Sequence, residues 1–461
     1  MGKGTLNLTT DPLPLLVVAI AVPAAMGMLF NTLFNVADMV CAGWLGTEAV
    51  AALSISFPLY FLITAVGSGI SQGATALIAH AFGAGNEKEG RRVFHQALLI
   101  SVFAGIGMAV CGMIAAPAVL RFLGASGSYL ETAVLFMRVI FAGSPFFTLV
   151  MVLNSYLSAS GRNAPYRNVL VAGFFANCAL NPVLMWGLLG LPRMGVGGLA
   201  LATVLVQVGG CLYLGMVISR HDPASDDGPI SWKPDFQRQK KILRQAIPST
   251  LNMVSIACGV FILTWFVKTF GTEAVAAMGL GTRIEQIILL PAIGISTAML
   301  SITGQNLGAG FHERIREAWM LCLKFSVSLM VAGGLVLWAA SERLIGLLSR
   351  DPVVIGHACE YLFVSAVTLA AYPILFSTVF MMQGLKKPMY GMAMGLYRQI
   401  IGPFLILTIL IRHFQLGLTW IWWGFSLVTW SAAVFALLFG FAALRRISNQ
   451  SPNLPHAEAS C

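Results

Sequence analysis

Residues 29–42 read LFNTLFNVADMVCA, and this stretch decides the fold class of the chain. It lies inside an apolar run that begins near Leu13, and three polar side chains interrupt it: Asn31, Asn35 and Asp38. Their spacing of i, i+4 and i+7 predicts a helix with all three on one face. An acid in a membrane-spanning helix is unfavourable by roughly 2.5–3.5 kcal/mol and normally faces a protein interior or a hydrated cavity. Asp38 is therefore a candidate functional residue; the alternative is an acid near a helix end that reaches the lipid headgroups.

The composition of the whole chain is that of a membrane protein. Of its 461 residues, 57% are hydrophobic and 10% are charged, and the mean hydropathy is +0.82. Apolar runs of about 20 residues or more, long enough for a helix to cross a bilayer, recur throughout. The predicted fold class is an all-α polytopic membrane protein. The net charge of +10 raises nucleic acid as a partner, but the bases lie in loops beside apolar helices, so we expect none.

About twelve transmembrane spans follow from the apolar runs. Their approximate bounds are 13–42, 48–80, 92–121, 131–160, 165–190, 194–219, 245–270, 275–306, 317–348, 355–383, 389–412 and 418–444. The loops on one side, together with both ends of the chain, hold most of the lysines and arginines. The positive-inside rule places that side in the cytoplasm. We therefore predict a multi-pass protein of the cytoplasmic (inner) membrane with both termini in the cytoplasm.

The two halves of the chain are related in sequence. A single shift without a gap lays Gly46–Ala52 (GTEAVAA) on the identical Gly271–Ala277, and Pro23 on Pro248. Such matches in one register indicate an internal duplication. We therefore predict an N-terminal six-helix lobe (1–219), a cytoplasmic linker (220–244) and a C-terminal six-helix lobe (245–461), the two lobes being pseudo-symmetric about an axis along the membrane normal.

The two halves also differ in the position of their acids. The same shift superposes Asp38 on Leu263 and Tyr60 on Glu285, so that each half carries one intramembrane acid at a different place. Duplication explains the shared scaffold. The residues that depart from it are therefore the better candidates for chemistry.

Four predicted helices of the N-terminal half carry polar side chains at helical spacing. The sets are Asn31 and Asn35 with Asp38, Asn154 with Ser158, Asn177 with Asn181, and Thr203 with Gln207. One such pair more often joins helices by hydrogen bonds than it forms a binding site. Four sets together with an acid favour a hydrated, ion-linked cavity. Phe34 and Tyr60 are among the aromatic residues that could line a cavity for flat, cationic compounds.

The C-terminal half contributes three charged candidates: Arg283, Glu285 and Arg398. Arg283 and Glu285 are two residues apart and do not face each other on a helix, so Arg398 is the better expected partner for Glu285. This group is either a structural ion pair or part of a substrate cavity. The eight cysteines and seven histidines show no metal-ligand or catalytic spacing, so we expect no metal, no cofactor and no enzymatic activity.

Longer motifs resemble a known family. Asn154–Gly161 (NSYLSASG), Asn177–Pro182 (NCALNP) and Gly304–Gly310 (GQNLGAG), together with twelve spans, a duplicated half and the acid in the first helix, resemble the multidrug and toxic compound extrusion (MATE) family. The resemblance covers nearly the whole chain. It implies two six-helix lobes around a central cleft, and drug efflux driven by protons or sodium ions that move inward.

The resemblance also implies roles for individual residues. Asp38 matches the family's coupling acid, and Asn154, Asn177 and Thr203 match the polar residues around it. Asn181 is an aspartate in one bacterial branch, and the acid that some members carry in the seventh helix is missing here. These departures favour coupling by protons, or a cation site in the N-terminal lobe, through Asp38.

The function expected from the sequence is export of amphipathic or cationic drugs in exchange for inward H⁺ by alternating access, by a monomer in the lipid bilayer. The candidate ion-coupling residues are Asp38, Asn154, Asn177, Asn181 and Thr203. The candidate cavity residues are Asn31, Asn35, Phe34, Tyr60, Gln207, Arg283, Glu285 and Arg398. The alternatives are a Na⁺-coupled drug antiporter and a flippase of related fold for lipids or lipid-linked sugars.

Overall fold

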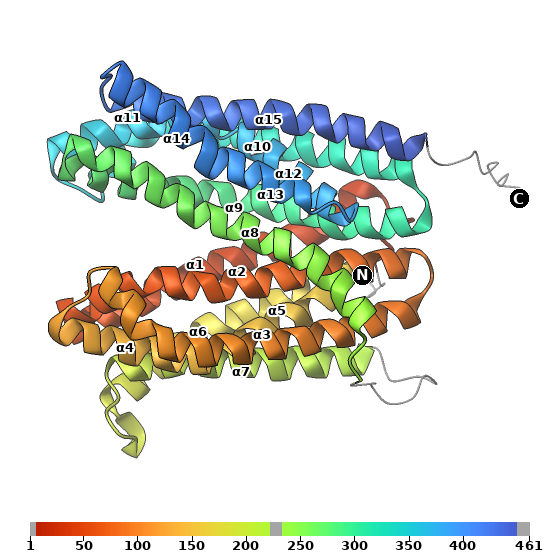
Figure 1. The fold of residues 1–461 in the computed structure, drawn as a ribbon, viewed down its shortest axis with the longest axis horizontal. Helices are drawn as coiled ribbons and strands as arrows, with labels where there is room; N and C mark the ends of the chain where they lie inside the picture. The colour runs from red at the N-terminus through yellow and green to blue at the C-terminus, as the bar shows by residue number, and fades with distance from the viewer. Residues whose placement is uncertain (1–5, 222–232, 450–461) are drawn as a thin grey trace, which may run out of the picture.

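The computed structural model describes residues 6–221 and 233–449, which form two helical lobes side by side (Figure 1). The first lobe contains α1 (Leu13–Leu45), α2 (Thr47–Gly83), α3 (Glu87–Phe122), α4 (Gly127–Ala142), α5 (Ser144–Ala159), α6 (Ala164–Trp186) and α7 (Val196–His221). The second contains α8 (Phe236–Val267), α9 (Thr272–Ala309), α10 (His312–Gly346), α11 (Pro352–Thr368), α12 (Ala371–Gly384), α13 (Met389–Leu396), α14 (Gly402–Leu407) and α15 (Thr419–Ser448). No strand occurs within these described ranges, and the predicted all-α fold is confirmed.

Ten of the described helices are long and apolar enough to cross a membrane, and two bent pairs raise the number to as many as twelve. The pairs are α4 with α5, bent by 45°, and α11 with α12, bent by 51°. Pro145 and Pro373 follow these bends. Neither has an N–H for the carbonyl four residues earlier, at Phe141 and Leu369, so each helix is interrupted. With each pair counted as one crossing, the prediction of about twelve spans is confirmed.

Both ends of the described chain meet the α9–α10 turn. Asn306 Nδ2 donates to the carbonyl oxygen of Leu8 at 3.0 Å, and Ser448 Oγ lies 3.5 Å from Oε1 of Glu313. We call this end of the bundle, at the right of Figure 1, the basic end, because Lys241, Arg244, Lys386 and Lys387 lie there. The prediction that both termini lie in the cytoplasm concerns Met1 and Cys461, which are outside the described residues.

Helix α8 begins earlier than predicted. It starts at Phe236, inside the segment 220–244 that the sequence predicts to be a linker, and α7 ends at His221. Asp235 caps α8, because its side chain accepts from the backbone N–H of Arg238 at 3.0 Å. The helical part of this segment was hidden by its polar composition. The division into lobes at 219/220 and 244/245 stays a prediction.

Each lobe holds the first part of the other lobe's first helix. Leu13, Leu16 and Ile20 of α1 are buried in a core formed by α9, α10, α12 and α15. Conversely, Ile242 and Ala246 of α8 are buried in a core formed by α2, α3, α5 and α7. The prolines that the duplication aligns, at 23 and 248, lie in the same two helices just after these exchanged segments.

Pseudo-symmetric glycine contacts join the lobes. A Cβ added at Gly83 of α2 would lie 1.8 Å from the carbonyl oxygen of Gln305, and one at Gly308 of α9 would lie 2.1 Å from that of His80. These contacts are equivalent, because the shift that relates the two halves also converts Gly83 into Gly308 and His80 into Gln305. Glycine is required here because the two backbones touch. The duplication seen in the sequence is therefore also the symmetry of the interface near the basic end.

Candidate functional site

Asp38 lies within membrane-spanning α1 and is held by neutral side chains of α6 and α7. Its Oδ1 accepts from Nδ2 of Asn177 at 3.0 Å and from Nδ2 of Asn181 at 2.8 Å. Thr203 Oγ1 lies 3.4 Å from Oδ2. The two asparagines are fully buried, and Thr203 is 3% exposed. The structure therefore brings together four of the five predicted ion-coupling residues.

A glycine allows α6 and α7 to approach each other at this site. A Cβ at Gly173, one turn before Asn177 on α6, would lie 2.8 Å from Cγ1 of Val206 on α7. The fixed helical spacing then places Asn177, Asn181 and Thr203 on facing surfaces. Asn177 Nδ2 lies 3.4 Å from Oδ1 of Asn181, and Asn181 Nδ2 lies 3.0 Å from Oδ1 of Asn177. These mutual contacts fix both amides beneath the carboxylate.

Asn154 belongs to a separate hydrogen-bond group. Ser158 Oγ lies 3.4 Å from Oδ1 of Asn154 and 3.0 Å from Oδ1 of Asn163. Asn163 Nδ2 in turn lies 3.4 Å from the carbonyl oxygen of Ile20, in the exchanged first part of α1. This group connects the α5–α6 corner to α1. The sequence motif identified Asn154 and Ser158, but it did not single out Asn163.

The other candidates of the first lobe differ in their exposure. Asn31 and Asn35 are exposed, and Asn35 Nδ2 donates to the carbonyl oxygen of Asn31 at 2.9 Å. Phe34 is 8% exposed. The ring of Tyr60 packs edge-on against Phe147, with 5.7 Å between the ring centroids. Gln207 is half-buried on α7, one turn beyond Thr203; these residues keep their predicted role as cavity candidates.

In the second lobe, Glu285 has a tyrosine as its partner rather than the expected arginine. Glu285 is 5% exposed, and its Oε2 accepts from the hydroxyl of Tyr361 on α11. Gly281, one turn before Glu285, makes room for this ring, because a Cβ there would lie 2.3 Å from Cδ1 of Tyr361. Sequence reasoning missed Tyr361 because the contact depends on how α9 packs against α11.

The two arginine candidates are not paired with Glu285. Within residues 6–221 and 233–449, no ion pair within 4.0 Å joins it to Arg283 or Arg398, and Arg283 is exposed. The guanidinium of Arg398 instead lies over the rings of Tyr372 and Phe425, at 4.8 and 5.8 Å from their centroids. The expected ion pair is therefore replaced by a hydrogen bond and by cation–π contacts.

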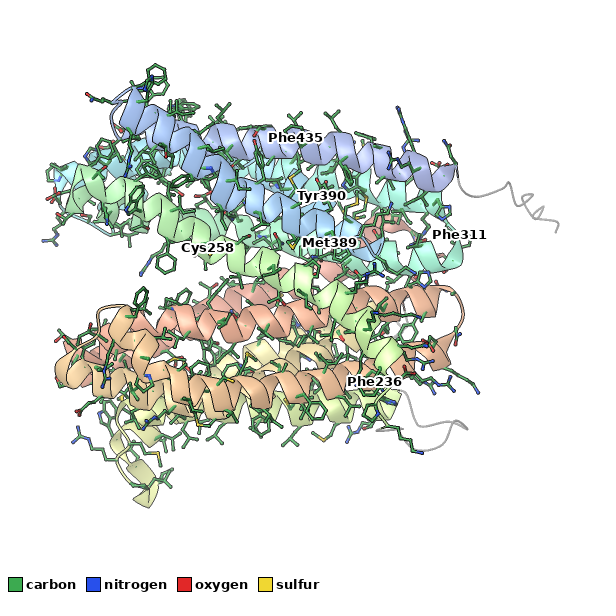
Figure 2. The ribbon with its side chains drawn as sticks, viewed as in Figure 1. Phe236, Cys258, Phe311, Met389, Tyr390 and Phe435 are labelled. Carbon is green, nitrogen blue, oxygen red and sulfur yellow. The ribbon has the colours of Figure 1, made fainter. Side chains whose placement is uncertain are left out.

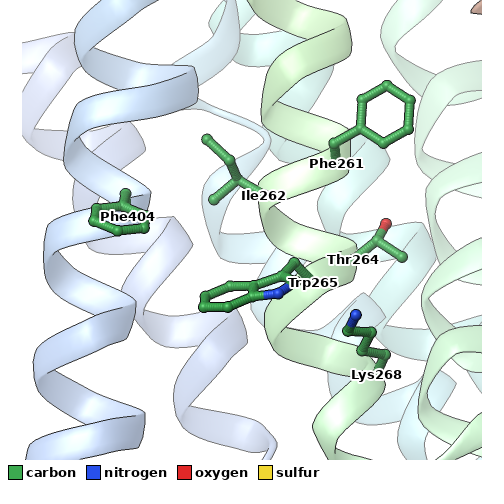
Figure 3. Close-up of a pocket in the computed structure, with 6 residues that line it drawn as sticks. All are labelled: Phe261, Ile262, Thr264, Trp265, Lys268 and Phe404. Carbon is green, nitrogen blue, oxygen red and sulfur yellow. The ribbon is translucent and has the colours of Figure 1, made fainter. Parts of the chain in front are cut away.

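A separate apolar pocket of about 480 Å³ lies between α8 and α14 (Figure 3). It is lined by Phe261, Ile262, Thr264, Trp265, Lys268 and Phe404. Its only charged lining group is that lysine, so it does not offer a carboxylate to a cation. Among the described residues, no group of three or more histidine, cysteine or acidic side chains could hold a metal ion.

A known family profile matches the chain twice, once in each half of the internal repeat. The MatE family profile matches residues 23–183 and again residues 248–408, two segments that are related by the same shift as the sequence repeat. The two matches together cover more than half of the chain. The chain therefore belongs to the MATE family of transporters, in which several relatives are described as multidrug resistance or export proteins, and the resemblance noted from the motifs is confirmed.

Individual relatives agree with this assignment. The chain is 29% identical to the probable multidrug resistance protein YoeA of Bacillus subtilis over 300 residues, which is 64% of this chain and 65% of that protein. It is 25% identical to the FAD transporter of Shewanella oneidensis over 398 residues, covering 86% and 87% of the two chains. A solved structure described as the outward-facing conformation of a multidrug resistance MATE transporter superposes with a TM-score of 0.90 at 26% identity, covering 98% of this chain and 100% of that one.

Proposed function

We propose that this transporter exports amphipathic organic cations by alternating access, in exchange for protons that move inward, and that Asp38 is the coupling carboxylate. The observation that carries the proposal is a carboxylate inside a membrane-spanning helix whose hydrogen-bond partners are all uncharged. Among the described residues, no cation lies within 4.0 Å of Asp38. Such a group is free to exchange a proton or a cationic cargo as its counter-ion.

The arrangement of the amides favours a proton over a sodium ion. A sodium ion requires oxygen ligands, but both asparagines direct Nδ2, an N–H donor, toward Asp38. Donated hydrogen bonds stabilise the ionised carboxylate in the absence of a bound metal. Protonation removes the negative charge without rearranging an oxygen cage. Sodium coupling remains the alternative, and it would require both amide groups to turn over.

The exchanged first part of α1 supplies a connection between Asp38 and the other lobe. Residues Leu13 to Ile20 are packed in the second lobe, whereas Asp38 contacts α6 and α7 of the first. Pro23 lies between the two parts and allows the helix to bend there. We infer that proton binding at Asp38 changes the packing of α1 and thereby the position of one lobe against the other. One charge that moves inward supplies about 2.3 kcal/mol per 100 mV.

The proposed cargo follows from the charge of the site. Ionised Asp38 attracts a cation, and protonation releases it, so that cargo and proton compete for one carboxylate. A flippase for lipid-linked sugars would instead need cations beside Asp38 to meet a pyrophosphate, and in the described part of the chain none lies within 4.0 Å of that carboxylate. Of the two arginine candidates, Arg398 is packed against aromatic rings. The Asp38 group is built from one chain, so the proposed functional unit is a monomer, located in the inner membrane with the basic end in the cytoplasm.

Asp38→Asn tests this proposal, because it keeps the shape of the side chain and fixes a neutral state. The purified variant, reconstituted into vesicles, should fold normally but lose both proton release on addition of ethidium and uphill ethidium transport. Asp351→Asn is the matched control, since Asp351 lies at the start of α11, outside the Asp38 group, and should keep both activities. Transport by Asp38→Asn against a gradient, with the pH dependence of the wild type, would refute the role of Asp38. Wild-type transport that requires Na⁺, in place of a proton gradient, would assign sodium as the coupling ion.

A further inference from the structure

A large cavity at the basic end is not part of the Asp38 group. It has a volume of about 1150 Å³ and is lined by residues of both lobes. The first lobe contributes the end of α2 and the start of α3, and the second contributes α8, the α12–α13 connection, α13 and α15. We call it the basic-end pocket. Figure 2 shows Met389 and Tyr390 on α13, with Phe236 marking the start of α8 on the same side of the molecule.

One side of the basic-end pocket carries an excess of positive charge. Five lysine and arginine side chains line it, with one carboxylate, that of Glu89. Arg238 is neutralised, because Glu89 accepts from its guanidinium at 2.7 and 3.0 Å and Asp235 also pairs with it. The other four cations have no carboxylate within 4.0 Å in the described part of the chain: Lys241, Arg244, Lys386 and Lys387. A set of unpaired bases in a cavity attracts and concentrates anions.

Lys241 and Lys386 are close enough for their charges to interact. Gln245 Nε2 donates to the carbonyl oxygen of Lys386 at 3.1 Å, and Lys386 has a φ of +60°, which is rare for a residue with a side chain. Partial burial, and then the charge of Lys241, lower the pKa of Lys386. The fold therefore keeps these positive charges close together, and a bound anion would reduce the repulsion between them.

The other side of the pocket is apolar and exposed. Met389 is 58% exposed and Phe439 is 47% exposed. The ring of Tyr390 stacks on Phe439, with 4.7 Å between centroids. The hydroxyl of Tyr390 is buried and has no hydrogen-bond partner among the described residues, so that a donor is available between the basic and the apolar sides.

We propose that the basic-end pocket binds one anionic phospholipid of the cytoplasmic leaflet. Its phosphate lies among Lys241, Arg244, Lys386 and Lys387, and its acyl chains lie along Met389 and Phe439. A phospholipid accounts for both sides of the pocket, whereas a soluble anion would leave the apolar side uncovered. In membrane proteins, basic pockets between helices on the cytoplasmic side bind anionic lipid headgroups.

The two-lobe lining gives this lipid a regulatory effect. Because the pocket walls come from both lobes, the lipid binds best when the lobes meet at the basic end, and it must stabilise that conformation. Binding itself does not depend on the proposed coupling by Asp38. Asp38→Asn protein should therefore still bind the lipid, so that failure of one proposal is distinguishable from failure of the other.

Lipid binding to the purified protein in zwitterionic detergent tests the proposal. Wild type should bind phosphatidylglycerol in preference to phosphatidylcholine at one site, measured by native mass spectrometry. Each base near an anionic headgroup contributes about fivefold in affinity, so Lys386→Gln with Lys387→Gln should weaken binding by about thirtyfold. The charge-matched control is Lys233→Gln with Lys240→Gln, two exposed lysines of the same end that do not line the pocket. It should stay within about twofold of wild type.

A second variant separates a lipid from a soluble anion. Phe439→Ser should weaken phosphatidylglycerol binding, and FAD, a soluble anion named for one relative, should not displace the lipid from the wild type. Equal binding of phosphatidylglycerol by the lysine pair variant and its control would overturn the proposal. FAD that displaces the lipid completely, together with an unaffected Phe439→Ser variant, would assign the pocket to a soluble anion and would also overturn it.

Discussion

Replacement of Gly83 by alanine tests whether the glycine contacts between α2 and α9 hold the basic end closed. The new Cβ would lie 1.8 Å from the carbonyl oxygen of Gln305, whereas ordinary contact begins near 3.4 Å. Backbone atoms cannot swing aside as a flexible side chain can. The two helices must therefore separate by more than 1 Å at this point.

The expected effect is a change in the equilibrium between conformations. Overpacking of this kind destabilises a closed contact by about 1–3 kcal/mol. That free energy changes the ratio of closed to open conformations by about 5- to 150-fold. Gly308→Ala should have a similar effect, because the pseudo-symmetric Cβ would lie 2.1 Å from the carbonyl oxygen of His80. The double variant should show less than the sum of the two effects, since one separation relieves both contacts.

Spin-label distances across the basic end would measure this shift. Labels replace Glu87 on α3 and Arg316 on α10, whose side chains are 73% and 59% exposed, in a background without the eight native cysteines. Gly83→Ala should increase the population of long distances. Gly279→Ala is the control, because it lies on α9 and a Cβ there meets nothing within 4 Å. Wild-type distances in both Gly83→Ala and Gly308→Ala would refute the reasoning.

Two further predictions concern other parts of the chain. Tyr361→Phe removes the hydrogen bond to the carboxylate of Glu285 and should lower the free energy of unfolding by about 1.5–3 kcal/mol; unchanged thermal unfolding of the purified variant would show that this bond contributes nothing. The backbone N–H of Arg238, and then its guanidinium, lower the pKa of Asp235 below its ordinary value of 3.8. The stability that Asp235 contributes is therefore present above that value and lost as the pH falls through the lowered pKa. Asp235→Asn should lose less stability than wild type when thermal unfolding is measured from about pH 5 down to pH 3, and an equal loss in both proteins would contradict this account.

The hydrophobic pattern was sufficient for the fold class. Long apolar runs have one stable arrangement in a bilayer, because every backbone polar group must be bonded within its own helix. The bent pairs α4–α5 and α11–α12 were harder to recognise, because the apolar pattern continues through Pro145 and Pro373. The start of α8 at Phe236 was missed for the opposite reason, since it is polar and is held by a cap and an ion pair.

The candidate site likewise has one part that the sequence predicted and one part that it did not. Helical spacing was enough to place Asn177 and Asn181 on one face, and the presence of an acid inside a membrane-spanning helix was enough to select Asp38. The partner of Glu285 was not predictable, because Tyr361 is 76 residues away and reaches it only through the space that Gly281 leaves.

By itself, the sequence determined what its local and repeated patterns encode: helices, their number, the duplication, and the face on which each polar side chain lies. The shift that relates the two halves also related the two glycine contacts between α2 and α9, because duplicated sequences fold alike. Only the tertiary structure decided which faces meet. It showed that Asn154 lies in a different group from Asp38, that the first parts of α1 and α8 are exchanged between lobes, and that five bases share one pocket. These contacts depend on packing between helices distant in sequence, and spacing along the chain carries no information about them.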